Sequence, residues 1–521
     1  YHVLVAELAA QRNAPALAAS HYLDAAALSN DPELAESATR YALLAGDEDR
    51  ALLAALRWSS LVPDAVPPRE LIARNHLRQG RLDALYAECT AIIARHPEGR
   101  DEGFREVALL LSGDPAQADP ALAVMQRLVN DEPQRAAGHY AYGLLAVRVG
   151  RHELGIQQAD AALKLERDWS EAYLLKIGAQ VRAGQLADAR RTHDRALRSS
   201  SEPILLRIAY ARLLLEAEQS EAAAEQYREV LRKDGSNPDA LFALALLSLQ
   251  ANKLDEAYRH LLTLFESGQR RDEAAWFLAQ IEEDRGHYRE AHTWYGAVTG
   301  GNRVVDALLR RAFTLYKTEG IEPAQRYLAE LRRRSAELGP RLYTAEAELY
   351  YEAGQPARAL QRYEAGLREF PEDSDLLYGR GMMRAELGEF ATAEQDLRAI
   401  LAKQPDDARS LNALGYLLSN HSDRYPEAFG YIERALKLTP DDPAVIDSMG
   451  WIQYRLGNLE RSLELLQDAF KRQPDPEIAA HLGEVLWQLG RRDNAQDVWR
   501  TALADNPDHR VLRETVDRLS K

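Results

Sequence analysis

The stretch LNALGYLLSNHSDRYPEAFGYIERALKLTP, residues 411–440, contains two apolar patterns in succession. Apolar or small residues recur three or four positions apart over residues 411–418, and they do so again over residues 428–436. Such spacing lines up one face of an α-helix. Pro440 ends the second pattern, because proline cannot continue a helix. The stretch therefore predicts two helices joined by a short turn.

The second of these helices recurs along the chain. The small residue that begins its apolar stretch is found 33 to 35 positions apart at Ala121, Gly155, Ala189, Ala223, Ala257, Ala291, Ala324, Ala359, Ala393, Ala428, Ser462 and Ala495. Weaker members at Ala18, Ala51 and residues 84–87 extend the series toward the start. A short side chain lets two helix backbones approach closely, so we expect the helices of each pair to cross at these positions and at small residues such as Gly415 and Gly483.

A 34-residue helical hairpin with these small residues and a closing proline resembles the tetratricopeptide repeat, and the resemblance covers essentially the whole chain. It implies an all-α fold, a TPR solenoid that winds as a right-handed superhelix of about 13–15 helix hairpins. We expect degenerate TPR-like hairpins over residues 1–135, a regular array over 136–507 and a C-terminal capping helix within 508–521.

Composition narrows the class of protein. Hydrophobic residues make up 46% and charged residues 28% of the 521 residues, which is typical of a globular chain. The formal net charge of −16 disfavours nucleic acid as a partner. The single cysteine, Cys89, excludes an intramolecular disulfide, and its apolar surroundings predict a small core residue.

No catalytic signature accompanies the repeat. The sequence lacks HExxH, a Walker loop, a nucleophile elbow and a calcium-binding loop. His287, Glu290 and His292 come closest to a metal motif, but residues five apart do not share a helix face. We therefore expect no enzymatic activity, no cofactor and no metal site.

Binding is expected on the first helix of each hairpin, which in this repeat family lines the concave surface. Its outward positions carry many aromatic residues, and these are separate from the crossing positions that build the core. Tyr, Trp and Arg dominate protein-binding hot spots, so we expect a protein-binding groove. Its predicted members are Tyr140, Leu144, Phe242, Trp276, Phe313, Tyr316, Tyr351, Tyr378, Met382, Asn412, Tyr416, Asp447, Trp451, Tyr454, Arg455, Glu484 and Trp487.

Three C-terminal motifs carry a closer resemblance. Residues 411–416 (LNALGY), 447–457 (DSMGWIQYRLG) and 475–490 (DPEIAAHLGEVLWQLG) are similar to the C-terminal signature of Gram-negative outer-membrane tetratricopeptide lipoproteins. The resemblance implies a non-catalytic adaptor that binds and activates a periplasmic carboxyl-terminal processing protease. It also implies that the adaptor delivers peptidoglycan cross-link hydrolases to that protease as substrates, which limits the opening of the cell wall.

The same resemblance implies a periplasmic outer-membrane lipoprotein that meets the membrane only through an N-terminal lipid anchor. This chain begins at Tyr1, so we expect a processed or truncated protein in which the signal peptide and anchor are out of view. A second interpretation is a scaffold lipoprotein of an envelope secretion or polysaccharide-export machine. The two interpretations differ in whether the chain affects proteolysis.

Overall fold

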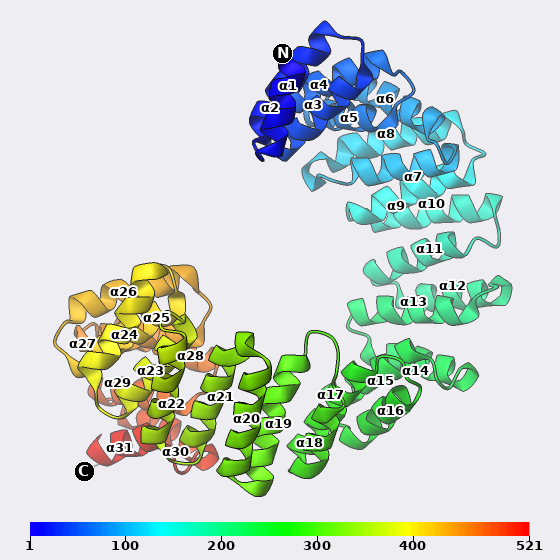
Figure 1. Ribbon diagram of the computed structural model, residues 1–521. Helices are drawn as coiled ribbons and strands as arrows, with labels where there is room; N and C mark the ends of the chain where they lie inside the picture. Colours follow the sequence, from blue (N-terminus) through cyan, green and yellow to red (C-terminus); the bar gives the residue numbers. More distant parts are fainter. Residues whose placement is uncertain (520–521) are drawn as a thin grey trace. The chain divides into compact units, whose positions relative to one another are not determined.

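The computed structural model describes residues 1–519, and these residues form 31 α-helices and two short 3-10 helices without a β-strand (Figure 1). The all-α class and the expected number of hairpins are confirmed, because the helices make fifteen consecutive pairs followed by one further helix. Within the described part of the chain, no helix combines the length and apolarity needed to cross a bilayer.

The contacts divide the chain into two compact units, Tyr1–Arg270 and Arg271–Lys521, which we call unit 1 and unit 2. Unit 1 contains α1 (His2–Gln11), α2 (Pro15–Leu28), α3 (Pro32–Leu44), α4 (Glu48–Leu61), α5 (Val66–Arg78), α6 (Leu82–Arg95), α7 (Arg100–Leu111), η1 (Pro115–Gln117), α8 (Ala118–Asp131), α9 (Ala136–Arg148), α10 (His152–Leu165), α11 (Ser170–Arg182), α12 (Leu186–Ser199), α13 (Pro203–Glu216), α14 (Ser220–Lys233), α15 (Pro238–Gln250) and α16 (Leu254–Glu266).

Unit 2 contains α17 (Arg271–Asp284), α18 (Tyr288–Gly296), α19 (Val304–Glu319), α20 (Ile321–Arg334), η2 (Ala336–Leu338), α21 (Gly339–Glu352), α22 (Pro356–Glu369), α23 (Ser374–Glu386), α24 (Phe390–Lys403), α25 (Ala408–His421), α26 (Tyr425–Leu438), α27 (Pro443–Arg455), α28 (Leu459–Arg472), α29 (Pro476–Gln488), α30 (Arg492–Asp505) and α31 (Arg510–Leu519). The last helix packs on α29 and α30 within the range predicted for a capping helix. Residues 520 and 521 of that range lie outside the described residues. The boundaries at 135 and 507, which were drawn on repeat regularity, stay a prediction.

The small residues of the repeating series lie where paired helices cross, as predicted. Ala428 and Ala495, for example, are fully buried. A Cβ atom added to Gly415 would lie 2.4 Å from Cγ1 of Ile432, and one added to Gly483 would lie 2.0 Å from Nε1 of Trp499. Both distances are shorter than van der Waals contact, so a larger residue would require the facing side chain, or the helix that carries it, to move.

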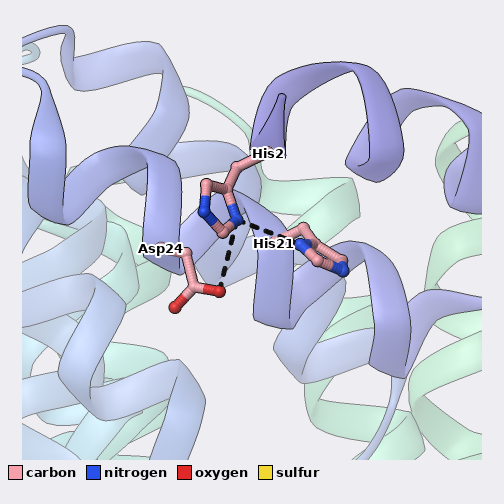
Figure 2. Close-up of side chains that lie close together, drawn as sticks. All are labelled: His2, His21 and Asp24. Carbon is pink, nitrogen blue, oxygen red and sulfur yellow. Dashed lines mark hydrogen bonds and ion pairs between the residues drawn. The ribbon is translucent and has the colours of Figure 1, made fainter.

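The first hairpin has a thin core. Tyr22 and the small residues Ala6, Ala9 and Ala18 are buried where α1 meets α2, whereas Leu4 and Leu8 of α1 are 70% and 52% exposed. A helix as short as α1 is marginal without such burial. On this hairpin, two histidines and an aspartate from α1 and α2 lie close together (Figure 2).

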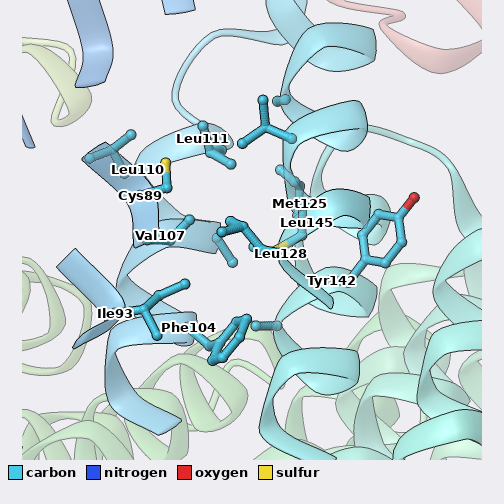
Figure 3. Packing of buried hydrophobic residues seen from close by; sticks show 14 of the residues in the cluster. Cys89, Ile93, Phe104, Val107, Leu110, Leu111, Met125, Leu128, Tyr142 and Leu145 are labelled. Atoms are coloured by element: carbon cyan, nitrogen blue, oxygen red, sulfur yellow. The ribbon is translucent and has the colours of Figure 1, made fainter. Parts of the chain in front are cut away.

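Further along unit 1, a larger cluster of aliphatic and aromatic side chains joins α5 to α9. Cys89 lies inside it with Ile93 of the same helix and Phe104 of α7 (Figure 3). Burial raises the pKa of the Cys89 thiol to about 12, so the thiol stays protonated and inert. The prediction of a core cysteine is confirmed.

Candidate protein-binding surfaces

In unit 2 the first helices of successive hairpins lie beside one another, since α21 contacts α23, α25 contacts α27, and α27 contacts α29. Their shared surface contains an open cleft of about 630 Å³, which we call the acidic cleft. It is lined by Tyr378, Met382, Asp407, Ala408, Arg409, Asn412, Ala413, Tyr416, Thr439, Asp442, Ala444, Val445, Asp447, Ser448, Gln473, Asp475, Glu477 and Ile478.

Three of the cleft's carboxylates begin helices. Asp407 accepts a hydrogen bond from the Ser410 amide at 2.7 Å, so it caps α25. Asp442 caps α27 and Asp475 caps α29 in the same way, at 2.9 and 2.8 Å. A carboxylate here satisfies a free amide and complements the helix dipole, which explains its recurrence at successive hairpins. The same carboxylates that cap the helices therefore place negative charge along one edge of the cleft.

The cleft carries five carboxylates against the single guanidinium of Arg409. Arg409 is already engaged, because it pairs with Asp375 at 2.6 Å and lies 4.1 Å from the centre of the Tyr378 ring. Apolar side chains, among them Met382 and Ile478, lie between the charges. The surface thus suits a segment that combines basic and apolar residues.

The carboxamide of Asn412 faces the same cleft. Its Oδ1 atom is buried and accepts no hydrogen bond within the described part of the protein. A buried acceptor without a donor is costly in the unbound protein. Because this oxygen is covered by the protein, a ligand in the cleft would reach it only after a local rearrangement.

A hydrogen-bonded network crosses the floor of the cleft. The Tyr416 hydroxyl of α25 donates to Oε1 of Glu477 at 2.6 Å and lies 3.3 Å from Nε2 of His481, although both partners belong to α29, two hairpins further on. Nδ1 of His481 lies 3.0 Å from Oδ1 of Asp447 on α27. The network therefore connects three consecutive first helices.

The network perturbs its titratable groups. Burial of the His481 ring opposes its charge, but the Asp447 carboxylate, with Glu477 and Glu484, outweighs burial and raises the pKa of His481 above its ordinary value. Burial and then Glu477 raise the pKa of Tyr416 well above its ordinary value. The tyrosine therefore remains a neutral donor, and protonation of His481 stabilises the buried Asp447 carboxylate beside it.

Two further aromatic residues, Trp451 and Tyr454, adjoin this network. The indole of Trp451 stacks on His481 at 4.1 Å between ring centres, and its Nε1 donates to Oδ1 of Asn420 at 2.6 Å. The Tyr454 hydroxyl donates a hydrogen bond to Glu484. Burial, and secondly this carboxylate, raise the pKa of Tyr454 to about 12. Glu484 in turn accepts from Arg518 of the capping helix at 2.5 Å. These aromatic side chains tie the final hairpins and the cap together.

Unit 1 has a contrasting surface on α9, α11 and α13, which we call the arginine-rimmed groove. It is an open hollow of about 580 Å³ lined by Leu144, Val147, Arg148, Leu174, Leu175, Gly178, Arg182, Ala209, Arg212, Leu213 and Glu216. Arg182 pairs with Glu216 at 2.6 Å and Arg212 lies 3.4 Å from Asp239, whereas the contact of Arg148 is to the Ser112 hydroxyl at 3.4 Å. An apolar floor with a basic rim suits a segment with apolar and acidic residues.

The predicted groove residues separate into three groups by exposure. Two are exposed, Tyr351 at 50% and Met382 at 41%. A half-buried group comprises Tyr140, Leu144, Phe242, Phe313, Tyr316, Tyr378, Asn412, Tyr416, Tyr454, Arg455 and Trp487. A buried group comprises Trp276, Asp447, Trp451 and Glu484, which are 5% to 8% exposed.

The expectation that the predicted groove residues point outward is wrong for this buried group. Neighbouring helices cover these side chains. The Trp451 ring of α27 stacks on His481 of α29, and Trp276 of α17 packs against Tyr295 of α18 and under Arg303. Binding by the other predicted residues stays a prediction. Five predicted residues, Tyr378, Met382, Asn412, Tyr416 and Asp447, come together in the acidic cleft.

The sequence interpretation missed the acidic edge itself. Asp407, Asp442 and Asp475 were outside the groove positions because they precede their helices. Their recurrence with the period of the hairpins was a visible signal. In unit 1, Arg182 and Leu213 were also missed.

Comparison with known proteins agrees with this architecture. Residues 208–266, 344–407, 384–443 and 448–510 match the tetratricopeptide repeat family. The chain is 34% identical to the TPR repeat-containing protein PA4667 of Pseudomonas aeruginosa, over 100% of this chain and 88% of that protein. It is 26% identical to cellulose synthase 2 operon protein C of Komagataeibacter xylinus, over 54% of this chain and 20% of that protein.

Among solved structures, the Cut9-Hcn1 hetero-tetramer of the APC/C is similar, with a TM-score of 0.37 at 14% identity over 100% of this chain and 96% of that chain. The chain belongs to the tetratricopeptide repeat family, a fold generally used as a non-catalytic protein-interaction scaffold. Repeats of this family suggest that the partners of the chain are proteins.

Proposed function

We propose that the chain is a non-catalytic adaptor that binds and activates a periplasmic carboxyl-terminal processing protease and delivers peptidoglycan hydrolases to it. The C-terminal motifs over 411–416, 447–457 and 475–490, which are similar to those of the lipoprotein adaptor LbcA, support the proposal. In this role the chain acts in the periplasm at the outer membrane, held there by an N-terminal lipid anchor.

One observation carries the proposal: the two units bear separate hollows of opposite charge. An adaptor must hold an enzyme and its substrate together, and two chemically distinct surfaces allow both to bind without competition. Holding them on one scaffold raises the effective concentration of substrate at the protease without any chemistry by the scaffold. The acidic cleft and the arginine-rimmed groove meet that requirement.

The test is a reconstitution of proteolysis. A peptidoglycan hydrolase is incubated with the chain, with the protease, and with both, and its cleavage is followed over time. We expect rapid cleavage only in the complete mixture. Cleavage by the chain alone would show that it is an enzyme, and an unchanged rate on adding the chain would exclude the adaptor role.

The variant Met382→Gln refines this test. Met382 is 41% exposed in the acidic cleft, so the change should leave the fold intact while it makes the end of the side chain polar without altering the charge of the cleft. Leu387→Gln is the matched control, because Leu387 is 37% exposed on the same hairpin but does not line the cleft. We expect about tenfold slower delivery for Met382→Gln and no change for the control.

A second candidate is a scaffold of an envelope secretion or polysaccharide-export machine. The similarity to cellulose synthase 2 operon protein C over 54% of this chain favours it. This candidate predicts that purified export components bind the chain and that the protease neither binds it nor changes its activity. The reconstitution therefore separates the two candidates.

A further inference from the structure

A cluster of potential metal ligands lies on the first hairpin, far in sequence from both hollows. His2 belongs to α1, and His21 and Asp24 belong to α2 (Figure 2). Because His21 and Asp24 are three positions apart, they lie on one face of their helix, and that face meets the start of α1. No metal site was expected from the sequence, and this cluster forms no local motif because His2 and His21 belong to different helices.

The distances within the cluster match a metal site. The two Nδ1 atoms of His2 and His21 are 3.1 Å apart, and Nδ1 of His2 lies 3.4 Å from Oδ2 of Asp24. Zinc binds histidine nitrogen and carboxylate oxygen at about 2.0–2.2 Å, so two ligands of a tetrahedral ion are separated by roughly 3.3 Å. All three ligand atoms lie within 4.8 Å of one another, and Asp24 is exposed enough to turn toward a common centre.

The Tyr1 ring lies beside both histidine rings. Both histidines are half-buried, and the Tyr1 ring meets their edges at 5.4 and 6.1 Å between ring centres. Two imidazole nitrogens that face each other at this distance share at most one hydrogen bond, and the Asp24 carboxylate forms an ion pair with His2 only when that ring is protonated. An ion at the centre engages all three groups at once.

We propose that His2, His21 and Asp24 bind one zinc ion or a similar first-row transition-metal ion. Two imidazoles and one carboxylate are a ligand set suited to such ions, and three protein ligands leave a fourth position for water. The site is independent of the proposed adaptor function and of both hollows.

Such an ion cross-links the start of α1 to α2. Apart from Tyr22, burial between these helices rests on small side chains, so a metal bridge adds a constraint to a core made mostly of alanine. An ion that binds the folded hairpin but not the unfolded chain stabilises the hairpin, and the stabilisation grows with the logarithm of the metal concentration. The expected role is therefore to order the first helix of the array.

The test uses the full chain without a polyhistidine tag, titrated with Zn²⁺ by calorimetry and with Co²⁺ by visible absorption. We expect one ion per chain, a four-coordinate Co²⁺ spectrum, and slower hydrogen exchange of the α1 amides with Zn²⁺. His21→Ala should weaken binding at least about tenfold, and Asp24→Asn, which keeps the side-chain size, should weaken it less.

His509→Ala is the matched control, because it removes a histidine from unit 2 and should leave the affinity unchanged. Circular dichroism of each variant confirms that the helices remain. The proposal is overturned if the parent binds no Zn²⁺, or if His21→Ala binds it as tightly as the parent does. A changed affinity in the control would equally place the ion elsewhere.

Discussion

The acidic cleft of unit 2 and the arginine-rimmed groove of unit 1 occupy the same structural position, the surface of consecutive first helices, yet they are built differently. The groove has a floor of leucine and valine with charges at its rim. In the cleft, aromatic, histidine and carboxylate side chains hydrogen-bond across three helices. Equivalent positions of a repeat can therefore either remain available to a partner or be used to hold neighbouring repeats together.

The largest expected difference concerns Trp451. The change Trp451→Ala removes a buried ring that stacks on His481. We expect the free energy of unfolding of unit 2 to fall by about 3–5 kcal/mol. Tyr351 is exposed, so Tyr351→Ala should change that free energy by less than about 0.5 kcal/mol. Hydrogen exchange measured at increasing urea concentrations reports the free energy of unfolding of both units in one experiment. Equal effects of the two changes would mean that the network does not hold the helices.

The charge of the cleft can be removed without removing its helix caps. In the triple variant Asp407→Asn, Asp442→Asn and Asp475→Asn, asparagine still caps each helix. We expect a lysine- and leucine-rich peptide to bind about tenfold more weakly, with a smaller salt dependence, as fluorescence anisotropy would measure. Asp373→Asn, at the cap of α23 outside the cleft lining, is the control. An unaltered affinity of the triple variant would place the peptide elsewhere.

The opposite experiment addresses unit 1, where Arg148 and Arg212 lie on the rim of the groove. Arg148→Gln with Arg212→Gln should weaken binding of a glutamate- and leucine-rich peptide about threefold to fivefold, because rim charges exposed to water contribute little each. Arg198→Gln, on the second-helix surface, serves as the comparison. The affinity of this glutamate- and leucine-rich peptide for the triple Asp→Asn variant of the acidic cleft should equal its affinity for the parent chain. If both peptides prefer one hollow, the two surfaces are not distinguished by charge.

The smallest effect concerns pH. Asp447 raises the pKa of His481 in the folded protein, against the opposing effect of burial. The protonated ring therefore stabilises unit 2 fully below the ordinary histidine pKa of about 6.5. That contribution is lost as the pH rises through the folded-state pKa. We expect the thermal midpoint of unit 2 to decline over this range and the decline to disappear in His481→Gln. A midpoint that rises with pH in the parent alone would contradict the assignment.

Much of the fold followed from local patterns. The small residues at Gly415, Ala428 and Ala495 marked helix crossings, because only short side chains permit such close approach and the requirement recurs along the array. The burial of Cys89 also followed from its apolar helix. The candidate surfaces followed only in part, since five predicted residues line the acidic cleft while Trp276 and Trp451 are buried.

The sequence by itself determined the repeat, the helix pairs and the list of side chains on each first helix, because these depend on interactions within a single hairpin. The tertiary structure alone decided which of those side chains remain exposed and which meet a neighbour. Tyr416 of α25 reaches Glu477 of α29, and His481 of α29 reaches Asp447 of α27. Such contacts depend on how closely successive helices stack, a quantity that the periodic pattern of one chain does not encode.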